Sequence, residues 1–255
     1  MVQKLFDIHG KIALITGSSQ GIGFVLAKGL AEAGCTVIIN GRDKLKAEKA
    51  VSSLKEMGHR VFYSIFDVSD EKAVEDQIKK IQITVGSIDI LINNAGIQIR
   101  NPLEKFQLSD WEQLMNVNLT GVFVTSKAVV QTMIERKKGK IINICSIQSE
   151  LARPTIAPYT ASKGGVRNLT RGMATDWGKY NIQVNGIAPG YFKTAMTKKL
   201  YEDKEFDEWL RSRTPANRWG DPDELVGSAI FLASRASDYI NGHIIYVDGG
   251  MLGCV

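Results

Sequence analysis

Tyr159 and Lys163 are the residues whose types and spacing most directly suggest chemistry. They lie four positions apart in a segment that reads as a helix, with Pro158 at its start, so they share one helix face. An ammonium about 5 Å from a phenol, at an effective dielectric of ~20, favours the phenolate by about 3 kcal/mol, or roughly two pKa units. Such a tyrosine approaches the range of a general acid or base. The spacing is common in helices, so the prediction depends on the surroundings of the pair.

Ser146 and Asn118 supply two further polar groups. Ser146 comes thirteen residues before Tyr159 and directly follows an apolar run. That places it at the carboxyl end of a predicted strand, where parallel sheets bind ligands. Asn118 stands among apolar residues of a predicted helix, where a buried amide needs a partner. Position therefore favours a catalytic group of four residues.

A glycine-rich turn near the start of the chain predicts a nucleotide site. Gly17, Gly21 and Gly23 follow an apolar run and precede a helical pattern. Glycines at this spacing let the backbone approach a pyrophosphate, which the helix N-terminus can bind. The predicted cofactor residues of this turn are Gly17, Ser19, Gln20, Gly21, Ile22 and Gly23.

Arg42 bears on the choice of cofactor. The second apolar run ends at Gly41 and Arg42, with Asp43 just beyond. An acidic residue here would bind the ribose hydroxyl of NAD, whereas a cation suits the 2′-phosphate of NADP. The residues favour NADP(H), with NAD(H) possible. The alternative is that Arg42 is a solvated residue at a helix start.

Two other strand ends carry candidate cofactor residues. Asp67, followed by Val68, could accept a hydrogen bond from the adenine amino group, or it could cap the helix that begins near Asp70. Asn94, Ala95 and Gly96 follow the fourth apolar run. They could let a flat cofactor lie against the backbone, or form a plain turn.

Short apolar runs alternate with amphipathic segments along the whole chain, which predicts the elements that position these residues. Most of the runs are continuously apolar, as in strands covered on both faces. The predicted strands are 11–16, 36–40, 60–65, 88–93, 140–146, 182–188 and 243–247, and the helices are 23–33, 44–57, 71–85, 111–136, 159–177 and 223–232. The alternation predicts an α/β fold, a Rossmann-type doubly wound parallel sheet of about seven strands with helices on both faces.

One segment interrupts this alternation. After Pro189 and Gly190, about 30 residues pass without a strand. An insertion after a strand's carboxyl end predicts a substrate lid over residues 190–220. Otherwise no linker or repeat divides the chain, so we expect one dinucleotide-binding and catalytic domain over residues 1–255.

Composition excludes several other classes. The three cysteines form no CxxC pair, so we expect no disulfide framework and no metal site, and Cys35 and Cys145 read as core residues. The net charge is +5, but the basic residues are scattered, and the short cluster 136–140 reads as a solvated helix end rather than a nucleic-acid site. The N-terminus shows no signal peptide, and no run of 18 apolar residues occurs. These features favour a cytoplasmic protein that binds neither nucleic acid nor membrane.

Together these residues resemble the short-chain dehydrogenase/reductase family over nearly the whole chain. The Ser146–Tyr159 spacing, the segment 189–194 and the closing segment 247–250 carry the resemblance beside the turns above. It implies a nicotinamide-dependent alcohol dehydrogenase or ketone reductase, usually a homotetramer. Two long helices, 111–136 and 159–177, would pair across subunits, and Gly164, Gly165 and Gly172 permit close packing.

The resemblance also implies a role for each site residue. Tyr159 exchanges the hydroxyl proton and Ser146 binds the substrate oxygen. Lys163 lowers the tyrosine pKa and holds the nicotinamide ribose, and Asn118 anchors a water of the proton relay. On the nicotinamide side the contacts are Pro189, Gly190 and Thr194.

Within the family, segments 142–146, 149–151, 185–194, 214–216, 218–220 and 241–243 are similar to those of gluconate 5-dehydrogenases. That similarity implies interconversion of D-gluconate and 5-dehydro-D-gluconate, a small sugar acid. The carboxylate of such a substrate needs a cation, and Arg100 is the first candidate because a guanidinium binds it in a fork. Glu150 and Arg153 follow Ser146 on the substrate loop. Arg100 could instead be a surface residue, and Arg153 could merely pair with Glu150.

Three alternatives stay open. Two keep the chemistry: another sugar-acid or polyol dehydrogenase, such as a 2-deoxy-gluconate 3-dehydrogenase, or a 3-oxoacyl-carrier-protein reductase. Acidic residues in the lid, from Glu202 to Glu208, disfavour docking of an acidic carrier. The third is a non-catalytic nucleotide-binding regulator, which the four filled catalytic positions disfavour.

Overall fold

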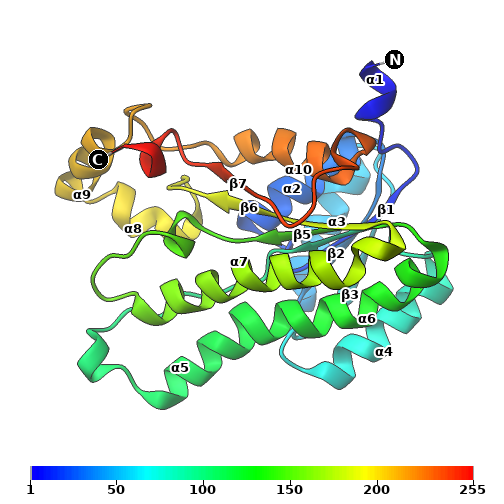
Figure 1. Ribbon diagram of the computed structural model, residues 1–255, viewed down its shortest axis with the longest axis horizontal. Coiled ribbons are helices and arrows are strands. Elements are labelled where there is room, and N and C mark those ends of the chain that lie inside the picture. The colour runs from blue at the N-terminus through cyan, green and yellow to red at the C-terminus, as the bar shows by residue number, and fades with distance from the viewer. Residues whose placement is uncertain (1, 255) are drawn as a thin grey trace.

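A parallel sheet forms the centre of the protein in a computed structural model that describes residues 2–254 (Figure 1). Within those residues seven strands lie in the order β3-β2-β1-β4-β5-β6-β7. Their bounds are β1 Ile12–Ile15, β2 Thr36–Gly41, β3 Val61–Ile65, β4 Ile90–Asn93, β5 Gly139–Ile144, β6 Ile182–Pro189 and β7 Ile244–Val247. The doubly wound Rossmann-type fold expected from the alternation is confirmed. The strand order reverses between β1 and β4, where such sheets bind ligands.

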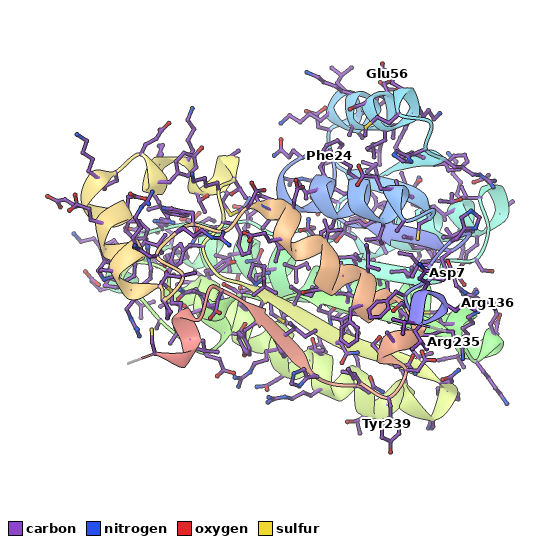
Figure 2. All side chains as sticks on the ribbon, turned by 90° about the horizontal axis from the view of Figure 1, so that it is seen from above. Asp7, Phe24, Glu56, Arg136, Arg235 and Tyr239 are labelled. Carbon is purple, nitrogen blue, oxygen red and sulfur yellow. The ribbon has the colours of Figure 1, made fainter. Side chains whose placement is uncertain are left out.

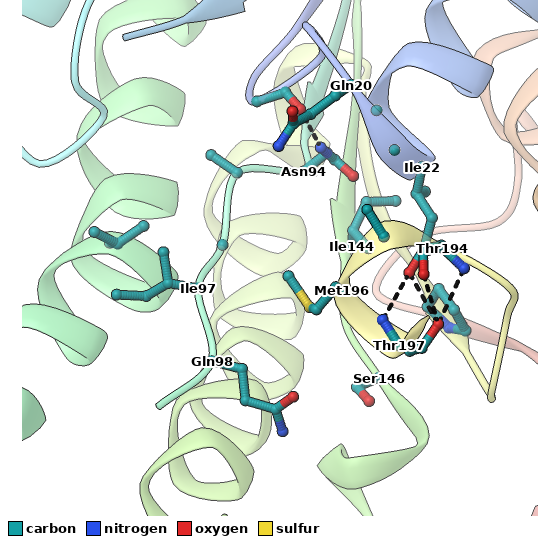
Figure 3. A pocket seen from close by; sticks show the side chains of 18 of the residues that line it. Gln20, Ile22, Asn94, Ile97, Gln98, Ile144, Ser146, Thr194, Met196 and Thr197 are labelled. Carbon is teal, nitrogen blue, oxygen red and sulfur yellow. Dashed lines mark hydrogen bonds between the residues drawn. The ribbon is translucent and has the colours of Figure 1, made fainter. Parts of the chain in front are cut away.

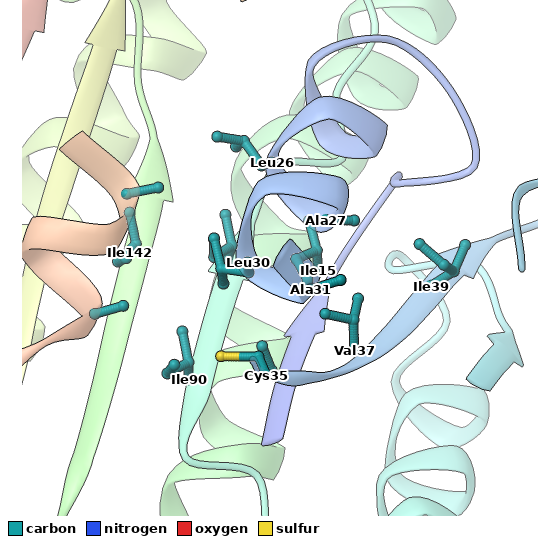
Figure 4. Packing of buried hydrophobic residues seen from close by; sticks show 14 of the residues in the cluster. Ile15, Leu26, Ala27, Leu30, Ala31, Cys35, Val37, Ile39, Ile90 and Ile142 are labelled. Carbon is teal, nitrogen blue, oxygen red and sulfur yellow. The ribbon is translucent and has the colours of Figure 1, made fainter. Parts of the chain in front are cut away.

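Helices cover both faces of the sheet. Their bounds are α1 Val2–Leu5, α2 Gly21–Glu32, α3 Lys44–Glu56, α4 Glu71–Thr84, α5 Leu108–Met115, α6 Gly121–Arg136, α7 Ala157–Trp177, α8 Lys198–Tyr201, α9 Lys204–Arg213 and α10 Val226–Ala233. Alternate residues of a strand face opposite cores. Ala13 and Ile15 pack towards α2, α3 and α10, whereas Leu14 packs towards α4, α6 and α7. Figure 4 shows Leu26 and Leu30 of α2 over the first of these cores.

Every predicted strand and helix is present, and the bounds differ by only a few residues. One of the larger shifts concerns the helix predicted from Trp111, which begins at Leu108. It continues through a π-helical turn at Asn116–Thr120 into α6. The helix predicted from Asp223 begins instead with a 3-10 turn, Pro222–Leu225. Helix ends depend on caps and local backbone bonds, which periodicity does not report.

The continuous helix Leu108–Arg136 is long and apolar enough, by length and composition alone, to cross a membrane. Half of its most apolar stretch is buried inside the protein. Val122, Val129 and Met133 belong to the core below the sheet. The burial and the contacts are those of a core helix.

The segment after β6 contains η5 (Ala195–Thr197), α8 and α9 and no strand, as expected of the lid. Its two ends meet in a single parallel bridge between Phe192 and Gly220. Inside the segment, Tyr191, Phe206 and Trp219 pack edge-on or tilted, with ring centroids 5.7–6.2 Å apart. Figure 1 shows α8 and α9 at the end of the molecule that also holds the C-terminus. The segment is therefore a small aromatic-cored unit beside the sheet's carboxyl edge.

The basic cluster at 136–140 is solvated in part, as expected of a helix end, because Arg136, Lys137 and Lys138 are exposed and Lys140 is not. Arg136 donates to Asp89 (2.8 Å) and to the Ile88 carbonyl (2.6 Å). Lys140 is largely buried and pairs with Asp238 at 2.8 Å. Figure 2 places Arg136 at the opposite end of the molecule from the lid. Arg136 and Lys140 thus have carboxylate partners at this end of the molecule. The prediction that Cys35 and Cys145 are core residues is confirmed.

Candidate active site

A cavity of about 470 Å³ opens at the carboxyl edge of the sheet, around the ends of β1, β2, β4, β5 and β6. Figure 3 shows Gln20, Asn94, Ser146 and Thr194 around it. The structure brings together all the predicted cofactor residues there: Gly17, Ser19, Gln20, Gly21, Ile22, Gly23, Arg42, Asp67, Val68, Asn94, Ala95, Gly96, Tyr159, Lys163, Pro189, Gly190 and Thr194. The strand ends supply them because all the strands are parallel.

The glycine-rich turn forms a cradle that side chains would fill. A Cβ on Gly17 would lie 2.8 Å from the Ala95 Cα, and one on Gly23 would lie 2.4 Å from the Asn94 amide nitrogen. Gly21 has φ +61° and faces open space. Gln20 at the N-cap of α2 makes no side-chain capping bond, whereas Asp43 and Asp70 cap α3 and α4. An uncapped, uncrowded helix N-terminus suits a phosphate group.

Three residues that sequence reasoning left outside the site hold this cradle in place. Asn40, which is buried, accepts from Gly17 N (3.1 Å) and donates to the carbonyls of Ser64 and Phe66. The Thr16 hydroxyl accepts from the backbone of Asn94 (2.9 Å) and Ala95 (3.0 Å). Ser18 donates to the Ile15 carbonyl at 2.7 Å. A polar residue next to a glycine turn was the only signal for these roles.

Arg42 and Asp67 lie together at the far end of the cavity. Arg42 Nη1 is 3.2 Å from the Asp67 carboxylate, and 64% of the Arg42 side chain is exposed. Burial acts to raise the pKa of Asp67, but hydrogen bonds from Ser69 and then Arg42 outweigh it, and the pKa lies below its ordinary value. The alternative that Asp67 caps a helix is wrong, because Asp70 caps α4 and Asp67 accepts from Ser69 instead.

Ser146, Tyr159 and Lys163 lie on one wall of the cavity. Ser146 follows β5, and its hydroxyl oxygen accepts from Gln148 N at 3.1 Å, which leaves its own O–H free to donate. Lys163 Nζ lies 5.8 Å from the centre of the Tyr159 ring and donates to the Ile144 carbonyl at 2.7 Å. Both residues project from the same face of α7, as their spacing predicted.

Burial is the largest cause of the pKa shifts of Tyr159 and Lys163. It raises the pKa of Tyr159 to about 12, although a hydrogen bond with Ser146 opposes the rise. It lowers the pKa of Lys163 to about 8. The sequence-based expectation of a lowered tyrosine pKa therefore has the wrong sign in this structure. The loss of hydration in the cavity wall, which spacing cannot report, outweighs the attraction between phenolate and ammonium.

Asn118 lies behind the wall and does not line the cavity. Its amide accepts from Ile97 N (2.8 Å) and donates to the Ile97 carbonyl (2.9 Å) and to Ser162 Oγ (3.2 Å). It is fully buried in the π-helical turn. The hydrogen-bond partner expected for this buried amide is therefore the loop after β4, and Asn118 links that loop to α7.

The candidate substrate residues separate into two groups. Arg100 and Arg153 line the cavity. Burial, and then the charge of Arg153, lower the pKa of Arg100. Glu150 does not line the cavity; it accepts from Tyr246 Oη at 2.8 Å and pairs with Arg167. The structure thus gives Glu150 other partners than a substrate.

Arg153 does not pair with Glu150, so that alternative is wrong. Its guanidinium lies 4.8 Å from the centre of the Phe206 ring in the lid and donates to Tyr191 Oη at 3.4 Å. Within residues 2–254, neither Arg100 nor Arg153 has a carboxylate oxygen within 4.0 Å. Guanidinium groups without a carboxylate partner are able to bind an anion.

Sequence reasoning missed several other lining residues. Gln148 and Gln98 bring amides to the substrate side, and lid residues add apolar surface, as Met196 and Leu200 do. Thr194, which was predicted, caps the 3-10 turn Ala195–Thr197 in a reciprocal bond with Thr197. Loop and lid residues of this kind have no periodic pattern, so their sequence carries almost no signal of where they point.

The fold and this cavity define a class of protein, an oxidoreductase that uses a nicotinamide cofactor on a CH–OH group. More narrowly, the chain belongs to the short-chain dehydrogenase/reductase family, since the family model described as short chain dehydrogenase matches residues 11–205.

Named relatives cover nearly all of the chain. It is 55% identical to a gluconate 5-dehydrogenase of Gluconobacter oxydans (strain 621H) over 97% of this chain and 96% of that one. It is 54% identical to a 5-keto-D-gluconate 5-reductase of Escherichia coli (strain K12), over 98% of this chain and 99% of that one. A solved gluconate 5-dehydrogenase of Burkholderia cenocepacia J2315, in complex with NADP and tartrate, is 53% identical with a TM-score of 0.98 over 100% of both chains.

Proposed function

We propose that the protein interconverts D-gluconate and 5-dehydro-D-gluconate with NADP(H). One observation of this structure carries the proposal: the guanidinium groups of Arg100 and Arg153 border the cavity that contains Ser146 and Tyr159. The reacting oxygen and a carboxylate can therefore be bound in one cavity. The relatives named gluconate 5-dehydrogenase and 5-keto-D-gluconate 5-reductase support the same substrate.

The cavity residues fit the cofactor. The cradle of Gly17, Gly21 and Gly23 would hold the pyrophosphate, and Arg42 would bind the 2′-phosphate in place of its contact with Asp67. Asp67 and Val68 would face the adenine. The residues 94–96, Pro189, Gly190 and Thr194 would border the nicotinamide half. When bound, the nicotinamide supplies or accepts the hydride.

The protein's own residues handle the proton and the charge on oxygen. Ser146 donates to the ketone oxygen and stabilises the charge that develops there. Tyr159, whose pKa is raised to about 12, carries its proton at neutral pH and can give it to that oxygen. In the oxidising direction Tyr159 must first lose its own proton; the Lys163 ammonium stabilises the resulting phenolate, which then accepts the proton of the substrate hydroxyl. Asn118 positions the Ile97 loop and α7, and its bond to Ser162, the residue before Lys163, suits a role in the proton relay.

Residues 190–220 act as a lid over the substrate side, within one domain. Arg153 reaches from the Ser146 loop to Phe206 and Tyr191 of the lid. A substrate carboxylate on Arg153 would therefore touch the lid as well as the sheet. We further propose that the protein is cytoplasmic and forms a homotetramer.

The proposal is tested by the change in absorbance at 340 nm with a panel of substrates. The panel contains D-gluconate, 5-dehydro-D-gluconate, 2-deoxy-D-gluconate and acetoacetyl-coenzyme A, each with NADP(H) and NAD(H). The expected result is the highest kcat/KM for 5-dehydro-D-gluconate, with a lower KM for NADPH than for NADH. Preference for the acyl thioester would overturn the assignment in favour of a carrier-protein reductase.

Arg100→Ala tests the carboxylate site separately. A hydrogen-bonded charge lost from this site raises KM for 5-dehydro-D-gluconate by about tenfold or more. The KM for 5-dehydro-D-fructose, which has the same C5 ketone and no carboxylate, should change little. Arg235→Ala, at the far end of the molecule (Figure 2), is the matched control. An equal KM for D-gluconate in the unaltered and Arg100→Ala enzymes would remove Arg100 from the site.

A further inference from the structure

Gln148 is a buried amide on the wall of the substrate cavity. It lies two residues after Ser146, and only 7% of it is exposed. Its backbone N–H donates to Ser146 Oγ, which fixes the distance between the two residues in the loop. Its side-chain oxygen is buried and has no hydrogen-bond partner among residues 2–254.

Buried polar atoms nearly always have a partner in folded proteins, so an exception needs an explanation. Few side-chain atoms of the described residues share this condition, and only the one in Gln148 belongs to a residue that borders the cavity. The others belong to residues that do not line the cavity, Asn93, Thr125, Thr160 and Arg167. The unpartnered oxygen of Gln148 therefore belongs to a side chain on the cavity wall.

The chemistry of the amide indicates which functional group of a ligand it can bind. A primary amide offers a donor and an acceptor side by side, which matches a hydroxyl group that donates and accepts. A carboxylate binds more strongly to Arg100 and Arg153 than to an amide, because both arginines carry positive charge. With Ser146 on the reacting oxygen, as proposed above, an amide two residues further along the same loop is placed to bond groups on the neighbouring carbons of the substrate.

We propose that Gln148 binds a hydroxyl group next to the reacting carbon and thereby selects polyhydroxylated ketones. This inference rests on the proposed function and adds a specificity-determining residue to it. A site built to bond a hydroxyl group discriminates strongly against an analogue that lacks it, because the protein's buried polar group then stays unpaired. Gln148 thus selects by hydroxylation, whereas Arg100 and Arg153 select by charge.

Two substrates separate these effects. 5-Dehydro-D-gluconate and 5-oxohexanoate share a C6 chain, a carboxylate and a C5 ketone, but 5-oxohexanoate has no hydroxyl groups. The experiment measures kcat/KM for both with NADPH in the unaltered enzyme and in Gln148→Leu. The expected result is a loss of about 10- to 100-fold on 5-dehydro-D-gluconate, with kcat/KM for 5-oxohexanoate unchanged or higher.

A matched control uses the other cavity amide. Gln98 also lines the cavity, but its side-chain oxygen already accepts from Arg100 Nη2 at 3.2 Å. Gln98→Leu acts through Arg100 on the carboxylate that both substrates carry, so both values should fall by the same factor. If Gln148→Leu lowers the melting temperature, Gln148→Met, which is unbranched, repeats the measurement and should give the same change in ratio.

The outcomes separate this inference from the proposed function. An unaltered enzyme that does not reduce 5-dehydro-D-gluconate overturns both. Where the unaltered enzyme is active, an equal loss on both substrates in the Gln148 variants assigns the residue a merely structural role and overturns the inference alone. The absence of any loss does the same.

Discussion

Tyr159 and Lys163 share a wall in which either charge is poorly hydrated. The phenol therefore keeps its proton more firmly than in water, and the ammonium loses its proton more readily. Both shifts follow from burial, and they favour the neutral forms of the two groups. This state suits proton donation to a ketone, and proton acceptance then depends on the lysine's charge.

Tyr159→Phe removes the proposed proton donor and leaves the ring in place. We expect kcat to fall at least ~100-fold in either direction, because general acid–base catalysis contributes about that much or more. The Kd for NADPH, measured by fluorescence, should change little. Near-normal turnover would exclude Tyr159 as the proton carrier.

Lys163→Met should stabilise the fold in a pH-dependent way. The folded-state pKa of about 8 lies below the ordinary value of 10.5. Below pH 8 the buried ammonium is charged in both states and destabilises the folded one. Between pH 8 and 10.5 only the unfolded chain stays protonated, so this penalty fades as pH rises.

The measurement is the melting temperature of both proteins at pH 7 and at pH 10. The variant should melt a few degrees higher at pH 7, with a smaller difference at pH 10. A difference that grows with pH would contradict the assigned shift.

Residue types and spacing predicted many of the residues that line the cavity, but they could not predict which side chains bond to one another. Glu150 and Arg153 are neighbours in the loop, yet Glu150 pairs with Arg167 and Arg153 contacts Phe206. A long side chain bonds to whichever group lies near it in the folded protein. For these two residues such groups lie in α7 and in segment 190–220. Gln148 was not predicted as a site residue, because a glutamine in a loop belongs to no periodic or spacing pattern in the sequence.

At the scale of elements, the cofactor cradle depends on how closely β1, α2 and the end of β4 approach. Asn94 donates to the carbonyls of Thr16 and Gly17 at 2.9 and 3.1 Å, across the point where strand order reverses. That approach is possible only with glycine at position 23. The sequence predicted this meeting of elements because continuously apolar runs alternate with helices. It could not predict the π-helical turn around Asn118, since such turns have no periodic signature.

Gly23→Ala tests this approach. The added carbon would lie 2.4 Å from the Asn94 amide and 2.6 Å from the Gly17 carbonyl oxygen. We expect a lower melting temperature and a KM for NADPH raised about tenfold or more, because the cradle must open. Gly227→Ala in α10 meets nothing within 4 Å and should leave both values unchanged or slightly raise stability. Equal behaviour of the two variants would show that the cradle tolerates the carbon.

At the scale of the whole molecule, the long helix α5–α6 exposes large apolar side chains. Leu108, Trp111 and Phe123 are 71%, 36% and 48% exposed. In contrast, a Cβ on Gly165 would lie 2.9 Å from Leu119, so this glycine serves packing within the chain. Exposed apolar side chains along one helix are typical of a surface that another subunit covers.

The proposed homotetramer predicts a solution mass of four 28.1 kDa chains. Size-exclusion chromatography with light scattering measures it directly. Phe123→Glu would place a charge on the exposed helix, and we expect it to shift the mass towards smaller species. A monomeric mass for the unaltered protein would refute the tetramer.

The bridge between Phe192 and Gly220 gives the proposed lid two ends that lie side by side. A segment whose ends meet can gain, lose or exchange residues without altering the spacing of β6 and β7. Mutation and selection can therefore remodel the surface over the substrate while the cofactor cradle and the proton-transfer residues are inherited unchanged. In this architecture, specificity for a new substrate can evolve by replacement of the proposed lid, while the residues that bind cofactor and transfer the proton stay the same.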